Sequence, residues 1–269
     1  MDKTDQHYLA GRIQDLCEKT YTEDYMTHTD FLSMSEMAVF YDSLRQSGEN
    51  LLSGTYRSVP YMVWGGWEDA ERRCICFLPT WMDRDAFLAQ EEAEPQVVSC
   101  IEVKPVSLRF ADELTHRDFL GALMHLGIER DRIGDILTDS QHAYVFVSRD
   151  MAELVCEDLT RVKHTTVICR IVSSAECDIR PSFEQIQGSV ASERLDAVLA
   201  MACRISRTKA QTLISQEMVF VDGRTASSTS LTLPEGARVS VRGYGKFIYD
   251  GILLKTRKDR LMIRIRKFV

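Results

Sequence analysis

The chain has 269 residues, of which 45% are hydrophobic and 27% charged, as is typical of a soluble globular protein of two or three domains. No run of about 18 uncharged apolar residues occurs and the first residues are polar, so a membrane-spanning helix and an ordinary secretory signal are not expected. The net charge of −7 is uneven: residues 192–269 carry 15 Lys and Arg against 7 Asp and Glu (+8), which leaves 18 against 33 (−15) for residues 1–191.

Residues 1–94 predict an α+β domain with three helices and two strands. The second helix has the clearest start, because Ser33 followed three residues later by Glu36 forms a capping-box pattern. The expected helices cover 5–19, 34–47 and 86–94, and the expected strands cover 61–64 and 74–78. Nothing in this region points to a particular chemistry.

Residues 95–180 predict the order β-α-β-β-α-β, which is the ferredoxin-like (RRM-like) pattern. The expected strands are 97–103, 135–138, 142–148 and 165–172, and the expected helices are 116–126 and 150–159. RNA-recognition modules, enzymes and small-molecule sensors all share this topology, so it decides no function. Tyr144 and Phe146 lie on one face of a strand. Base stacking is one interpretation of this pair, and a place in the core is the one we favour.

The eight cysteines include no C-x-x-C pair, so neither a zinc site nor a redox motif is predicted. We interpret them as small hydrophobic side chains in a reducing cytoplasm. No bound metal and no cofactor is expected. The sequence also lacks the G-x-S-x-G, H-E-x-x-H and P-loop motifs of common enzymes.

Residues 181–191 are mostly polar, and the charge balance changes sign there, so we expect a linker. The domain that follows, 192–269, is predicted to begin with two helices and to end with a basic β-hairpin. The helices are expected at 194–203 and 207–216, and strands at 218–221 and 239–241. The basic residues near the carboxyl end are Lys255, Arg257, Lys258, Arg260, Arg264, Arg266 and Lys267.

The start of the second of these helices is a candidate phosphate site. Arg207 and Lys209 lie in its first turn, where the helix dipole disfavours cations by roughly a few tenths of a kcal/mol. A phosphate held by these side chains, by the Ser206 hydroxyl and by the first helix amides would offset that cost. The alternative is an ordinary solvated helix surface.

A second candidate segment has two glycines framing basic and aromatic residues, which lets a backbone approach a sugar-phosphate chain. It runs from Arg242 to Phe247. The complete set of residues predicted to contact such a chain is Arg194, Arg204, Ser206, Arg207, Lys209, Arg224, Arg242, Gly243, Lys246 and, in the middle region, Arg117. A charge of +8 on this part of the chain predicts a polyanionic partner.

The carboxyl-terminal module resembles the S4 (αL-type) RNA-binding domain over residues 194–247. The resemblance is carried by Arg194-Leu195-Asp196, Ser206-Arg207, Ala210, Leu213-Ile214, Val219, Val221 and Gly223. The chain departs from that family at Glu217, where glycine is usual, and at Asp222, where asparagine is frequent. Both departures add negative charge near the expected RNA surface.

The upstream part resembles the YlmH family of bacterial S4-domain proteins. That resemblance rests on 116–123, 126–130 and 133–137, together with Phe31-Leu32 and Glu36. It implies an α+β protein with an N-terminal domain, an RRM-like middle domain and a C-terminal S4 domain. It also implies a non-catalytic, cytoplasmic RNA-binding protein on the large ribosomal subunit, in quality control of stalled translation.

The partners implied by this resemblance are large-subunit ribosomal RNA, tRNA or peptidyl-tRNA, and ribosomal proteins. We expect no membrane insertion and a monomeric chain. Two alternatives stay open. One is an RNA-modifying enzyme whose active site lies unrecognised in the first two-thirds of the chain. The other is an interaction protein of the cell-division machinery.

Overall fold

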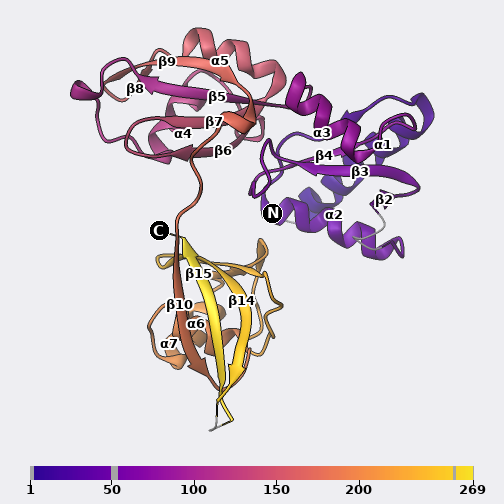
Figure 1. The fold of residues 1–269 in the computed structure, drawn as a ribbon. Helices are drawn as coiled ribbons and strands as arrows, with labels where there is room; N and C mark the ends of the chain where they lie inside the picture. The colour runs from indigo at the N-terminus through magenta and orange to yellow at the C-terminus, as the bar shows by residue number, and fades with distance from the viewer. Residues whose placement is uncertain (1–2, 50–53, 257–258, 269) are drawn as a thin grey trace. The chain divides into compact units, whose positions relative to one another are not determined.

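The chain forms two compact units, Met1–Arg180 and Pro181–Val269, in a computed structural model that describes residues 3–49, 54–256 and 259–268 (Figure 1). The first unit contains two sheets and five α-helices, and the second contains one sheet and two α-helices within the described residues. No helix in the described ranges is long and apolar enough to cross a membrane.

The amino-terminal half of the first unit is a four-stranded sheet in the order β1-β4-β3-β2. Helices α1 and α2 pack on one face of this sheet through a core that includes Ile13, Phe40 and Phe77. The Ser33–Glu36 capping box is present at the start of α2, as predicted. The elements are α1 (Lys3–Glu23), β1 (Thr27–His28), α2 (Met34–Gln46), β2 (Thr55–Tyr56), β3 (Val59–Trp64), β4 (Cys74–Phe77) and α3 (Arg84–Ala93).

The second half of the first unit has the strand order β6-β7-β5-β9-β8, with every neighbouring pair antiparallel. Apart from the two-residue β8, this is the order 2-3-1-4 of the ferredoxin-like fold, which confirms the prediction. The elements are β5 (Val98–Pro105), η1 (Leu108–Phe110), α4 (His116–His125), η2 (Arg130–Arg132), β6 (Ile133–Thr138), β7 (Ala143–Ser148), η3 (Arg149–Met151), α5 (Ala152–Asp158), β8 (Arg161–Val162), β9 (Thr165–Val172) and η4 (Ser174–Glu176).

The two faces of this second sheet are buried against different partners. Alternation along β7 sends Val145 and Val147 into a core with α4 and α5. Phe146, on the opposite face, joins a core with residues of the first sheet. Gly66 permits that approach, because a Cβ at this position would lie 2.8 Å from Val98 Cγ1 and closer still to the Phe146 ring. The two halves therefore share a core, and a domain boundary at 94/95 stays a prediction.

The predicted linker at 181–191 is wrong, because most of it is strand β10 (Phe183–Val190), which pairs along its whole length with β15 (Leu261–Phe268). Its polar residues alternate toward solvent, while Val190 is buried. Gly188 sits opposite Met201, whose Cγ would be 2.6 Å from an added Cβ. A polar composition suggested a linker, but the alternation is that of a strand with one solvated face.

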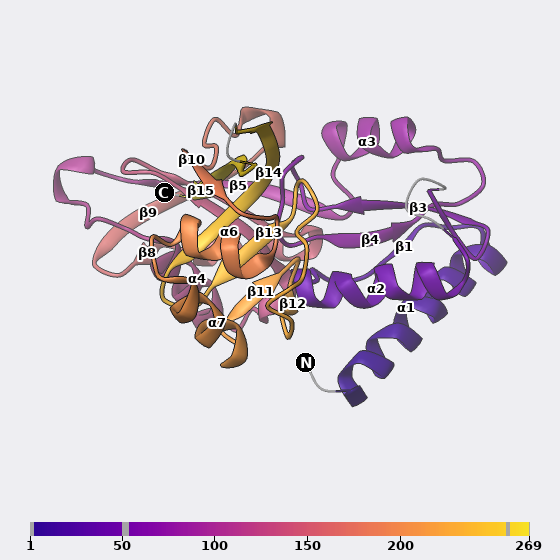
Figure 2. The same ribbon diagram turned by 90° about the horizontal axis from the view of Figure 1, so that it is seen from below.

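The second unit is a six-stranded sheet in the order β10-β15-β14-β13-β11-β12, accompanied by two short helices (Figure 2). The remaining elements are α6 (Leu195–Ala202), α7 (Arg207–Ser215), β11 (Val219–Val221), β12 (Arg224–Thr225), β13 (Arg238–Val241) and β14 (Gly245–Lys255). The predicted carboxyl-terminal hairpin is present as β14 and β15. Two of its basic residues, Arg257 and Lys258, lie outside the described residues.

Candidate nucleic-acid interface

A buried carboxylate connects the starts of α6 and α7. Asp196, in the first turn of α6, is 0% exposed. Arg207 donates to it through both Nε (2.9 Å to Oδ2) and Nη2 (3.1 Å to Oδ1). Gln211 Nε2 donates at 2.9 Å, and Arg194 Nε at 3.3 Å. The structure therefore brings together two of the predicted RNA-contacting residues, Arg194 and Arg207, around Asp196.

Charge pairing keeps this cluster ionised. Burial alone would raise the pKa of the Asp196 carboxyl, but the hydrogen bonds from Arg207, Gln211 and Arg194 outweigh it and lower the pKa to about 2. The hydrogen bond to Asp196 also raises the pKa of the Arg207 guanidinium. Both guanidinium groups are partly exposed and use only some of their five N–H donors on Asp196. The N–H groups that do not contact Asp196 can therefore bind a further acceptor.

The α6–α7 turn and the first turn of α7 hold three more of the predicted residues. Ser206 is the N-cap of α7, as expected, and its Oγ accepts from the Lys209 amide at 3.1 Å. The Lys209 side chain is exposed, and no described residue forms an ion pair with it. Arg204 is also exposed, with its guanidinium 3.8 Å from a Glu184 carboxylate oxygen. Lys209 is therefore the most available cation at this corner.

Both helices end in a left-handed residue that is not glycine. Arg204 follows α6 with φ +54°, and Glu217 follows α7 with φ +56°. In each case the next amide reaches back to a carbonyl in the last turn: Ile205 to Ala200 and Met218 to Leu213, both at 3.0 Å. This is the Schellman arrangement, in which glycine is preferred. The departure of Glu217 from the S4 pattern is thus a strained position as well as a charged one.

We expect Glu217→Gly to raise the free energy of unfolding of the second unit by about 1 kcal/mol, because glycine has no Cβ to strain in the left-handed region. Thermal unfolding followed by circular dichroism measures the change. Gln216→Gly, one position earlier at φ −88°, is the matched control and should be destabilising. Equal effects of the two substitutions would contradict the prediction.

The remaining predicted residues of this unit lie on turns of the sheet. Asp222 and Gly223, both with positive φ, form the expected tight turn, and exposed Arg224 follows it. The Asp222 carboxylate accepts from the Arg238 amide at 2.9 Å, so its negative charge is held within the turn. An asparagine Oδ1 could accept the same hydrogen bond, so this turn accommodates either residue.

Arg242 begins the β13–β14 turn, and its guanidinium lies 5.2 Å from the centroid of the Phe220 ring. No described residue forms an ion pair with it. Gly243 adopts φ +82°, and Lys246 is exposed on β14 opposite Ser240. This turn therefore presents a stacked arginine and an exposed lysine beside a glycine that leaves the backbone accessible.

Three arginines of the terminal hairpin contact groups of the sheet itself. Arg264 and Arg266 lie 3.4 Å and 2.9 Å from the carboxylate of Asp250. Arg260 donates to the Ser189 hydroxyl and carbonyl of β10 at 2.8 and 2.7 Å. These contacts occupy three of the hairpin's basic side chains within the protein. Arg117, the last predicted residue, is exposed on α4, which belongs to the first unit and not to the S4 domain.

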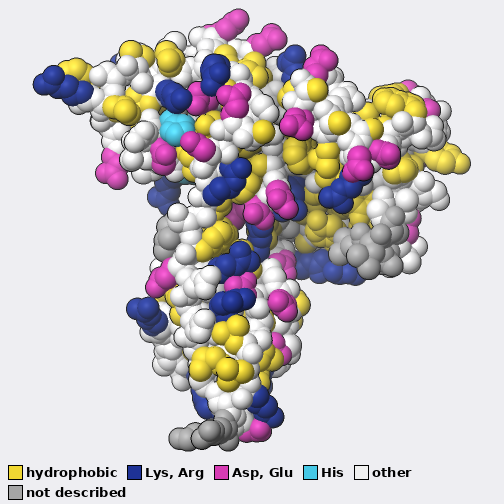
Figure 3. All heavy atoms as spheres, in the orientation of Figure 1, with side chains coloured by type: hydrophobic (Ala, Val, Ile, Leu, Met, Phe, Trp, Pro, Cys, Tyr) yellow, Lys and Arg dark blue, Asp and Glu magenta, His cyan; other side chains and the backbone are white. Residues whose placement is uncertain are grey.

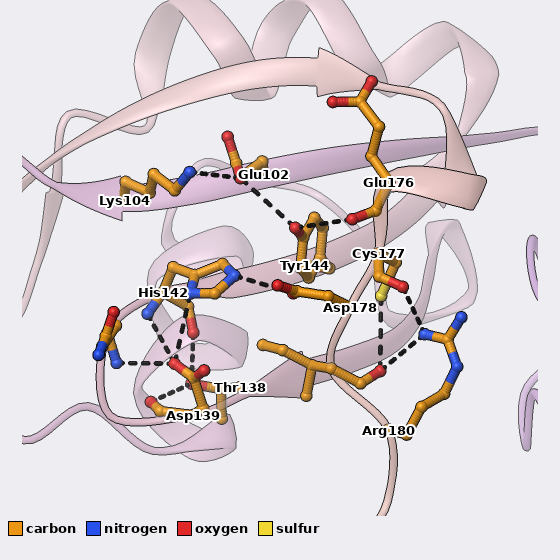
Figure 4. A network of polar contacts seen from close by, with 12 residues as sticks. Glu102, Lys104, Thr138, Asp139, His142, Tyr144, Glu176, Cys177, Asp178 and Arg180 are labelled. Carbon is orange, nitrogen blue, oxygen red and sulfur yellow. Dashed lines mark hydrogen bonds and ion pairs between the residues drawn. The ribbon is translucent and has the colours of Figure 1, made fainter.

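The face of the RRM-like sheet that carries Tyr144 and Phe146 does not offer these aromatic rings to a ligand. Tyr144 and Phe146 are both buried, which confirms their assignment to the core. Figure 4 shows the polar network over this face: the Tyr144 hydroxyl donates to the Glu176 carbonyl at 3.0 Å, and Lys104 Nζ lies 2.6 Å from Glu102. Arg170 adds a second ion pair to Glu102 at 3.2 Å. Base stacking on this face is therefore blocked by the protein's own contacts.

The cysteine side chains are all free thiols, five of them buried and three partly buried. Burial raises the pKa of Cys17 to about 11 and that of Cys169 to about 12, so these groups remain protonated at neutral pH. Within the described ranges no three His, Cys, Asp or Glu side chains gather as metal ligands.

Sequence reasoning missed the central role of Asp196 and the contribution of Gln211. One signal was available for Gln211, because it follows Arg207 by four residues and so shares its helix face. No local signal shows that Asp196 faces α7, since the two helices meet only in the tertiary structure.

The helix pair, the turns of the sheet and their cations define an RNA-binding protein of the S4 class, and residues 193–239 match the S4 domain. Residues 97–176 match the family described as "Putative RNA-binding domain in YlmH". The chain is 30% identical over 207 residues to "Ribosome-associated protein quality control protein P2" of Bacillus subtilis (strain 168), covering 76% of each chain. The chain therefore belongs to the YlmH family of S4-domain proteins.

Among solved structures, "Cell division protein ylmH from Streptococcus pneumoniae" is similar to this chain with 18% sequence identity and a TM-score of 0.49. The similarity covers 67% of this chain and 98% of that chain.

Proposed function

We propose that this protein is a non-catalytic, cytoplasmic binder of structured RNA that associates with the large ribosomal subunit. Its ligands are ribosomal RNA together with tRNA or peptidyl-tRNA, and its role is in quality control of stalled translation. The observation that carries the proposal is the α6–α7 corner, where Asp196 fixes two arginines beside exposed Lys209. The name of the Bacillus relative supports the ribosomal part of the proposal.

The chemistry of this corner suits a phosphate backbone. A guanidinium group that is already held in place loses little freedom when its remaining N–H groups bind phosphate oxygens. The first amides of α7 and the Ser206 hydroxyl lie at the same corner and favour an anion. Arg204, Arg224, Arg242, Gly243 and Lys246 extend the proposed surface along the turns. Contacts of this kind recognise the shape and backbone of folded RNA, with little base readout.

The two units carry net charges of opposite sign, which supports RNA binding through the second unit. Pro181–Val269 carries 15 basic and 8 acidic residues, a net of +7, and Met1–Arg180 carries the other 18 and 32, a net of −14. An acidic first unit disfavours indiscriminate binding to RNA, and a basic second unit favours it.

Sedimentation of a cell lysate through a sucrose gradient tests the proposal. We expect the protein to travel with large ribosomal subunits, and more of it to do so when stalled complexes are enriched. Treatment with RNase should return it to the top of the gradient. A protein that stays at the top under all conditions is not ribosome-associated, and a nucleoside modification lost on gene deletion would contradict a non-catalytic role.

A further inference from the structure

One end of the first unit exposes apolar side chains on an ordered loop. Val106, Leu108 and Phe110 are all exposed between β5 and α4, Phe110 by 78%. The Arg109 guanidinium lies 5.5 Å from the centroid of the Phe110 ring. In Figure 3 the end of the unit beside β8 shows hydrophobic and Lys or Arg side chains next to one another. We call Val106–Phe110 the tip loop.

Hydrogen bonds to the β8–β9 hairpin hold both ends of the tip loop. The Val106 amide donates to the Thr166 carbonyl at 3.0 Å. On the other side, the Asp112 carboxylate accepts from the His164 amide at 3.0 Å and from the Thr165 hydroxyl at 3.2 Å. Within the loop the 3₁₀ turn Leu108–Phe110 orders the backbone. The backbone that carries the exposed side chains of Val106, Leu108 and Phe110 is therefore preorganised, which lowers the entropy cost of binding.

The charges around the tip loop favour an anionic partner. Asp118 is held by Lys163 at 2.9 Å, and Asp112 by the hairpin, so two of the nearby carboxylates are occupied within the protein. Arg109, Arg117 and Arg161 are exposed on this loop and on the segments that adjoin it, where Glu113, Glu157 and Asp158 are exposed acidic residues. Within residues 106–110 the one charged side chain is Arg109, so the tip loop itself is cationic on a unit whose overall charge is −14.

We propose that the tip loop is a second RNA-binding site, which takes unpaired nucleotides: Phe110 stacks on a base, Leu108 contacts the same or the next base, and Arg109 and Arg161 contact phosphates. An exposed aromatic ring beside cations is the usual means of binding single-stranded RNA. The sheet face used for that purpose in other RRM-like domains is closed here, because Tyr144 and Phe146 are buried. The proposal shares the RNA partner of the proposed function but uses none of the S4 residues.

Binding of a fluorescent, unstructured 12-nucleotide RNA to the full chain tests the site. Phe110→Ala should weaken binding about tenfold, since stacking of one base is lost, and Phe110→Trp should retain it. Tyr21→Ala is the matched control, because Tyr21 is 71% exposed on α1 and should be neutral. Ultraviolet crosslinking of the native chain should join the RNA to the peptide that contains Phe110.

Unchanged affinity of Phe110→Ala, or equal loss in Tyr21→Ala, would overturn the proposal. So would reduced ribosome association of Phe110→Ala with unchanged RNA affinity, which would assign the tip loop to a protein partner. A failure of the proposed function would give a different result. Lys209→Gln combined with Arg242→Gln would then leave binding to ribosomal RNA unchanged, while Phe110→Ala would still weaken binding to the 12-nucleotide RNA.

Discussion

Asp196→Ala should lower the free energy of unfolding of the second unit by about 2–3 kcal/mol. The carboxylate is fully buried and accepts hydrogen bonds from Arg207, Arg194 and Gln211. Removing one partner of a fully buried ion pair costs about 3–5 kcal/mol. The smaller figure applies here because both arginines are partly exposed and can turn to water.

Hydrogen exchange followed by mass spectrometry localises this loss. Peptides from α6 and α7 should exchange roughly 30- to 150-fold faster in Asp196→Ala, which is the equivalent of 2–3 kcal/mol. Peptides from the first unit serve as the internal reference. Asp259→Ala removes an exposed carboxylate that pairs with Lys255 at 2.7 Å and should change exchange little. Similar behaviour of the two variants would show that Asp196 is not a structural centre.

The contribution of Asp196 should also depend on pH. Its pKa is lowered from 3.8 to about 2, so the folded state holds the charged form more tightly than the unfolded chain does. This stabilisation is complete above the unfolded pKa and is lost as the pH falls through the folded pKa. The stability difference between the native protein and Asp196→Ala should therefore be constant above about pH 4 and shrink between about pH 4 and pH 2.

Lys209→Gln combined with Arg242→Gln should weaken binding to ribosomal RNA by roughly tenfold or more at physiological salt. Neither side chain has an ion-pair partner among the residues the structure describes, so each is available for a phosphate. The slope of log affinity against log salt should fall by about two, one for each lost phosphate contact. A salt titration of RNA binding by fluorescence anisotropy measures both quantities.

The structure also shows which substitutions make a clean test of this surface. Arg207→Gln would disturb Asp196 as well as RNA, so loss of binding could follow from loss of structure. Lys255→Gln removes one charge from the same unit at an exposed residue paired with Asp259, and it should leave the salt slope unchanged. If Lys255→Gln and Lys209→Gln alter the slope equally, overall charge rather than the α6–α7 corner governs binding.

Much of the local structure could be predicted from the sequence, because its signals lie within a few residues of one another. The Ser33–Glu36 capping box, the Ser206 N-cap, the Asp222-Gly223 turn and the strand order of the middle region all belong to this class. The prediction of a linker at 181–191 was wrong because it rested on local composition alone. Composition is a local property, whereas β10 is defined by its pairing with β15, about eighty residues further along the chain.

The features of the candidate site also fall into two groups, those set by the local sequence and those set by tertiary contacts. The basic character of residues 192–269, the S4 pattern and the positions of Arg207, Lys209 and Arg242 are properties of the sequence alone. Only the tertiary structure decided that Arg207 is held by Asp196, that Asp250 takes up the charges of Arg264 and Arg266, and that the middle sheet buries Tyr144 and Phe146. Periodicity and capping report how a segment folds, but whether a charge or a ring is available to a ligand depends on contacts with distant segments.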